Sequence, residues 1–185
     1  MQKLPPYLVA GVCALFVSCS KQERAATAPM NEPPPPAVDA CALLTSEEIA
    51  SVQGEPIQQT TPTTQSAAGF VVSQCYYALP THTNSIVVTV TQPATSDARA
   101  LNVQWNEMFH SNRAERDEGE EKEKAPPREV AGIGEQAYWT GSSITGALYV
   151  LHGNRHLRIS VGGAGDENAK IDKTEALAEF ILKRL

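Results

Sequence analysis

Two strand-like runs on either side of Gly153 and Asn154 constrain the fold of this chain more than any other feature. The runs are residues 147–151 and 155–161, and a two-residue Gly153-Asn154 loop that pairs His152 with Arg155 is typical of a β-hairpin. The predicted register puts these side chains on one face: Leu148, Val150, Leu157, Ile159 and Val161. It puts these on the other: Tyr149, Leu151, His156, Arg158 and Ser160. We therefore expect an antiparallel sheet with one fully buried face.

A capping box predicts the first helix. Thr45 and Glu48 are spaced to cap a helix over 46–53, and Gly54 is suited to end it. Runs rich in Val, Tyr and Thr predict further strands, over 73–79, 84–92 and 136–140.

Two longer helices follow from apolar spacing. Residues 95–113 have apolar side chains three and four apart, which places Trp105 and Met108 in the core, with Thr95 or Ser96 as the cap. A last helix over 167–183 is expected to pack on the sheet. The fold class is therefore α+β, a single domain with a central antiparallel sheet packed by helices.

The N-terminal sequence is typical of an export signal. An apolar run over 7–17 follows Lys3 and is too short for a membrane span, which needs about 20 residues. The run ends at Phe16-Val17-Ser18-Cys19, which resembles a bacterial lipobox. We predict a lipoprotein signal peptide over 1–18 and acylation of Cys19, with a secretory cut near 25–28 as the alternative. The protein would then be a membrane-anchored lipoprotein of the cell envelope, facing the periplasm or the exterior.

The segment after Cys19 has little to bury. Residues 19–39 contain five prolines and no aromatic residue, which predicts a disordered, Pro-rich tether. The folded domain is then expected over 40–185. The chain has 15 basic and 21 acidic residues without a basic stripe, so we expect no nucleic-acid partner.

Two cysteines remain in the predicted domain. In an oxidising compartment, Cys41 and Cys75 are expected to form a disulfide. A metal pair or a redox pair are the alternatives, and neither has CxxC spacing to support it.

No motif specifies a reaction. His152 and His156 are four residues apart, but on the two sides of a hairpin turn they face opposite ways, so we predict no metal site. Gly132 and Gly134 lack the rest of a dinucleotide motif and are interpreted as turn residues. The charged segment 113–128 mixes both signs and is interpreted as solvated. We predict no catalytic residue and no cofactor.

The second face of the hairpin is the remaining candidate for a binding surface. Tyr149, His156 and Arg158 share it, and we place Trp139 nearby. The 95–113 helix is the alternative occupant, and it would turn this face into a second core.

Two short motifs carry a resemblance. Cys41-Ala-Leu-Leu-Thr-Ser-Glu-Glu-Ile49, with Gln74-Cys75-Tyr76 and later Val130-Ala-Gly-Ile-Gly-Glu-Gln-Ala-Tyr138, is similar to a domain-of-unknown-function family of bacterial lipoproteins, best known from actinobacteria. The resemblance covers about 40–185. It implies a PsbP-like fold, and it implies no activity, because the family has no assigned reaction.

The functional expectation follows from the anchor, the tether and the lack of a catalytic set. We expect a non-enzymatic, lipid-anchored module that binds an envelope protein or a cell-wall component. The alternatives are a small-ligand carrier that uses the polar sheet face, and an enzyme with a dispersed site.

Overall fold

A computed structural model describes residues 36–111, 126–142 and 144–185, and all of them fall in one compact unit. The predicted signal peptide, Cys19, most of the tether and most of the charged 113–128 segment lie outside the described residues. Within the described ranges, no helix has the length and apolar character to cross a membrane.

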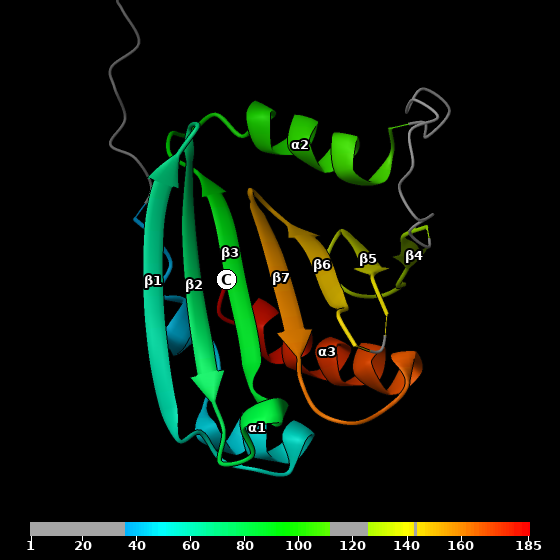
Figure 1. Cartoon of the computed structure of the whole chain (residues 1–185). Coiled ribbons are helices and arrows are strands. Elements are labelled where there is room, and N and C mark those ends of the chain that lie inside the picture. Colours follow the sequence, from blue (N-terminus) through cyan, green and yellow to red (C-terminus); the bar gives the residue numbers. More distant parts are fainter. Residues whose placement is uncertain (1–35, 112–125, 143) are drawn as a thin grey trace, which may run out of the picture. The chain divides into compact units, whose positions relative to one another are not determined.

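One antiparallel sheet organises the described residues, as predicted, and its strand order is β1-β2-β3-β7-β6-β5-β4 (Figure 1). The strands are β1 (Gln59–Ala67), β2 (Phe70–Ala78), β3 (Ile86–Pro93), β4 (Arg128–Glu129), β5 (Gln136–Thr140), β6 (Ala147–His152) and β7 (Arg155–Val161). The helices are α1 (Ser46–Gln53), α2 (Arg99–Phe109) and α3 (Glu167–Leu182), with short 3₁₀ turns η1 (Ala40–Ala42) and η2 (His82–Asn84). This confirms the α+β class.

The β6–β7 hairpin has the predicted register. Leu148 pairs with Ile159, Val150 with Leu157, and His152 with Arg155. The apolar face of the hairpin is buried against α3, and we call this side of the sheet the inner face. The opposite side is the outer face. The main core therefore lies between the inner face and the pair α1 and α3 (Figure 1).

The first helix has the predicted caps. The Thr45 backbone N–H donates to Glu48 Oε2 at 2.9 Å, and the Glu48 N–H donates to Thr45 Oγ1 at 3.2 Å. Gly54 ends the helix with φ 81°, a conformation that favours glycine. The guanidinium of Arg184 bonds the same Glu48 carboxylate at 2.8 Å and holds its pKa below the usual value.

The predicted disulfide is present between Cys41 in η1 and Cys75 in β2, with a Cα–Cα distance of 5.0 Å. Cys75 is fully buried in the core. The bond fastens the segment that enters the domain to the second strand of the sheet.

Some predicted elements differ in the structure. Strand β1 was not predicted, since all nine of its residues are exposed and it has no apolar alternation. Helix α2 begins at Arg99, so the predicted caps at Thr95 and Ser96 are wrong, and Ala98 at the N-cap makes no side-chain cap. Met108 was predicted in the core, but it is 41% exposed.

Candidate binding surface on the outer face

A row of polar and aromatic side chains crosses the outer face. Directly paired residues of antiparallel strands share a face, and the pairing joins Gln74 to Thr89, Thr89 to Arg158, Arg158 to Tyr149, and Tyr149 to Tyr138. Apart from the exposed Gln74, these side chains are half-buried. The row thus combines a cation, hydroxyl groups and aromatic rings on one broad surface.

Arg158 lies near the middle of this row. Its Nε donates to the Tyr149 hydroxyl at 3.1 Å, and its guanidinium carbon is 5.7 Å from the centre of the Tyr149 ring. The ion pairs among the described residues are Arg99–Asp97 and Arg184–Glu48, so Arg158 has no carboxylate partner there. The two terminal nitrogens of Arg158 also make no hydrogen bond within those ranges. The guanidinium is oriented by Tyr149 and still has donors available for a ligand.

Helix α2 closes one end of the outer face (Figure 1). The ring centres of Trp105 and His156 are 4.9 Å apart, and Trp105 Nε1 donates to Gln136 Oε1 at 2.7 Å. Phe109 stacks on Tyr138 with ring centres 4.7 Å apart, and its ring centre lies 5.6 Å from that of Tyr149 in a T-shaped arrangement. This end of the face is therefore a second, aromatic core. Coverage by the 95–113 helix was one of the two alternatives that the sequence left open for this face.

His156 belongs to that second core. It is only 5% exposed, and burial lowers its pKa to about 4, although a hydrogen bond with the Leu101 backbone acts in the opposite direction. A neutral, covered imidazole cannot contact a ligand at the surface. Of the four predicted surface residues, the structure therefore brings together Tyr149 and Arg158 as accessible groups and puts His156 beneath Trp105.

The predicted position of Trp139 is wrong. Trp139 pairs with Leu148, which puts its ring on the inner face, where it is 2% exposed. Its neighbour Tyr138 takes the outer position that the sequence analysis gave to Trp139. Alternate residues of a strand face opposite ways, so placing β5 against the hairpin required the pairing register that the sequence analysis lacked.

Thr89, Gln74 and Tyr138 are surface residues that the sequence analysis missed. Thr89 donates to Gln74 Oε1 at 3.3 Å and extends the polar row beyond Arg158. Strand 84–92 was predicted, but its pairing with the hairpin was not. The signal was the alternation of Val88 and Val90 with Thr89, which already placed Thr89 away from the core.

The two hairpin histidines lie as the register predicted. His152 is opposite Arg155, and His156 is opposite Leu151 on the other face. In the part of the chain that the structure describes, no group of three or more His, Cys, Asp or Glu side chains is placed to hold a metal ion.

A buried lysine has a structural role. The Nζ of Lys170 in α3 donates to the backbone oxygens of Gly163 at 2.7 Å and Val161 at 3.1 Å, and burial lowers its pKa. Lys173 donates to Gln53 Oε1 at 2.8 Å. These bonds fix the β7–α3 connection and α1 to α3, away from the outer face.

Comparison of the chain with protein-family models, with curated proteins and with solved structures finds no match.

Proposed function

We propose that this chain is a lipid-anchored, non-enzymatic binding module of the cell envelope, and that its outer face binds an acidic group on an envelope protein or a cell-wall component. The observation that carries the proposal is the Arg158 guanidinium, half-buried in the middle of a sheet, oriented by Tyr149 and without a described carboxylate partner. The localisation rests on the lipobox that ends at Cys19 and on the Pro-rich tether.

The chemistry of the surface favours binding over turnover. A guanidinium stays protonated at physiological pH, so it attracts an anion and does not exchange a proton with it. Its planar set of donors matches a carboxylate. The neighbouring rings of Tyr149, Tyr138 and Phe109 supply an apolar border, and this border also suits a small organic acid. A small-ligand carrier is therefore the second candidate function.

The proposal includes membership of the lipoprotein family that the motifs at 41–49 and 130–138 resemble. The antiparallel sheet with helices packed on it, and the Cys41–Cys75 bond, support that assignment.

Fractionation of a bacterial host that expresses the full chain tests the anchor. We expect the wild-type chain in the membrane fraction, with the mass of an acylated N-terminal Cys19. The variant Cys19→Ala is expected to lose the acyl mass and to leave that fraction. An unacylated mature chain that begins near residues 25–28 would contradict the lipoprotein assignment.

Equilibrium binding of the full chain tests the surface. The probes are purified cell-wall material and membrane proteins of the host, followed by thermal shift with a panel of small organic acids. A hydrogen bond to a charged group stabilises a complex by about 2 kcal/mol, so its loss in Arg158→Gln is expected to weaken binding roughly thirtyfold. Arg158→Lys should restore part of the affinity, since it keeps the charge without the planar donors.

Arg128→Gln is the matched control, because Arg128 lies on strand β4 and its Nη1 donates to Asn168 of α3 at 2.7 Å. It removes the same charge elsewhere and should leave binding unchanged. Equal losses in the two variants would reduce the effect to net charge and contradict the proposed surface. A thermal shift with a small acid, and no binding to the macromolecular probes, would favour the carrier.

A further inference from the structure

Strand β1 is a long, open edge of the sheet. It pairs with β2 along its whole length, and among the described residues no strand pairs with its other side (Figure 1). All nine residues are exposed. Such an edge presents unpaired backbone donors and acceptors to the surroundings.

The β1–β2 turn determines which backbone groups are free. Ala68 and Gly69 have φ values of 51° and 83°, as in a two-residue hairpin turn whose flanking pair, Ala67 and Phe70, exchanges both hydrogen bonds. Alternation then directs the backbone groups of Thr60, Pro62, Thr64 and Ser66 away from β2. Pro62 lies at a position that needs no donor toward β2, as expected for proline on an edge strand. The N–H groups of Thr60, Thr64 and Ser66 remain available.

The usual protections of an edge strand are sparse here. Strand β1 has no charged residue, and its pairing with β2 runs from Gln59 to Ala67 without a bulge. Natural edges are commonly shortened, charged or bulged to prevent pairing with another chain. Pro62 is the one protective residue, and it interrupts only the middle of the edge.

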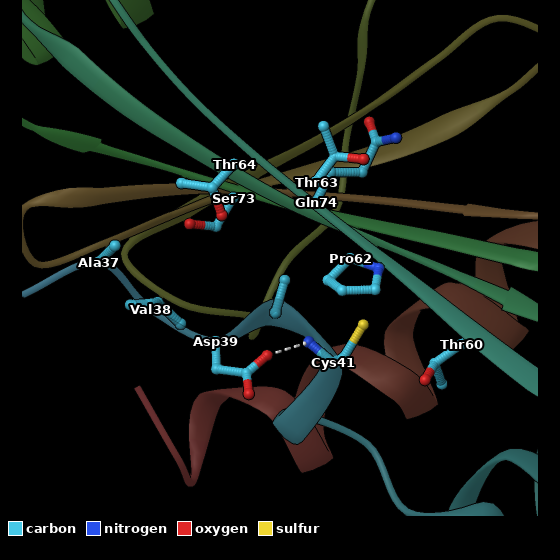
Figure 2. A pocket seen from close by; sticks show the side chains of 11 residues that line it. Ala37, Val38, Asp39, Cys41, Thr60, Pro62, Thr63, Thr64, Ser73 and Gln74 are labelled. Atoms are coloured by element: carbon cyan, nitrogen blue, oxygen red, sulfur yellow. Dashed lines mark hydrogen bonds between the residues drawn. The ribbon is translucent and has the colours of Figure 1, made fainter.

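A groove runs beside this edge on the inner face. A cavity of about 370 Å³ lies between residues 37–41 and the inward side chains of Thr60, Pro62 and Thr64. Figure 2 shows the side chains that line it. Ser73 also lines it; this residue is 3% exposed, and its hydroxyl has no hydrogen-bond partner among the described residues. Asp39 is the single charged residue among the lining residues.

We propose that β1 accepts an added strand from a partner protein, an extended segment with a basic side chain that enters the groove near Asp39. Backbone pairing to Thr64 and Ser66 would supply the affinity, and the groove would select alternate side chains, as in other cases of strand addition. Gln74 ends the outer-face row and also lines the groove; the other residues of the two surfaces are separate.

A second copy of this chain fits the edge less well. Registers that overlap two β1 strands around Pro62 leave both prolines without a donor. Such a pair would also bring two Asp39 carboxylates to the grooves and no cation from β1, which has no basic residue. The charge and the proline therefore favour a different, basic partner.

The test uses the full chain and a synthetic library of nine-residue peptides with blocked ends and lysine fixed at the centre. The strongest binder is then resynthesised with N-methyl groups on one or the other set of alternate residues. We expect one set to weaken binding at least tenfold and the other less than twofold, because only one set of N–H groups faces β1. No binder at 100 μM, or equal loss from both sets, would overturn the proposal.

Protein variants locate the site. Thr64→Pro removes an outward N–H and is expected to weaken binding tenfold, whereas Thr64→Ala keeps that N–H and should bind normally. Asp39→Asn keeps the oxygen that caps the Cys41 N–H at 2.9 Å, and it should abolish the preference for lysine over norleucine. Arg158→Gln should have no effect here, which separates this proposal from the outer-face function. A dimer that Thr64→Pro abolishes would assign the edge to a second copy instead.

Discussion

Replacement of Cys41 by serine tests what holds the entry of the chain to the sheet. The disulfide closes a loop with a sequence separation of 34 residues. In the chain-entropy model, closing a loop of this length stabilises the folded state by about 4 kcal/mol, because it restricts the unfolded chain. Cys41 itself is half-buried, so the serine hydroxyl adds little cost of its own. We therefore expect Cys41→Ser to lower the free energy of unfolding by about 4 kcal/mol.

Urea unfolding followed by tryptophan fluorescence measures this loss. Trp105 and Trp139 are both buried, and they lie on opposite faces of the sheet, so the signal reports on both cores. The slope of the unfolding free energy against urea should rise in the variant, because an unlinked chain exposes more surface on unfolding. Reductant should destabilise the wild-type chain to the level of the variant and leave the variant unchanged. A loss below about 1 kcal/mol would refute the assumption that loop closure controls stability here.

The remaining predictions concern the second core and the turn before β5. Burial lowers the pKa of His156 to about 4, below the ordinary 6.5, so the unfolded chain takes up the proton first as the pH falls. The free energy of unfolding is expected to be highest above pH 6.5 and to fall by about 3 kcal/mol on acidification to pH 4. Urea titrations at several pH values measure this fall, and it should be smaller in His156→Gln. An equal fall in the variant would contradict the burial argument. Gly134→Ala would place a Cβ 2.5 Å from Val150 Cγ1 and 2.6 Å from the Leu151 oxygen, whereas a Cβ at Gly132 meets no atom within 4 Å. Thermal melts should therefore show a clearly larger loss for Gly134→Ala than for Gly132→Ala, and equal losses would mean that backbone strain alone determines both.

Much of the fold was predictable because short-range rules decide it. The Thr45–Glu48 capping box fixed the start of α1, and Gly153-Asn154 fixed the hairpin register, which in turn sorted ten side chains between two faces. Each of these features depends on residues within a few positions of each other. The Cys41–Cys75 pair was predictable from the number of cysteines in the predicted domain, given the prediction of an oxidising compartment.

Other features depend on pairings that the sequence does not encode locally. Strand β1 has Thr, Gln and Ser on both faces, so only its pairing with β2 and the turn at Ala68-Gly69 make it a strand. Trp139 was misplaced since nothing local sets β5 against β6. Without these pairings, Thr89 and Tyr138 could not be placed on the outer face. For the same reason, the sequence left open whether α2 covers that face. Arg158 and Tyr149 were found because the hairpin alone brings them together.

Site-specific photo-crosslinking in intact cells tests the central claim most directly. A photoreactive residue replaces Thr89, beside Arg158 on the outer face, and in a control chain it replaces the exposed Asp172 of α3. We expect a defined adduct from position 89, with an envelope protein or with cell-wall material, that disappears when Arg158→Gln is added. Identical adducts from both positions, or an adduct from position 89 that persists in Arg158→Gln, would contradict the binding function proposed for the outer face.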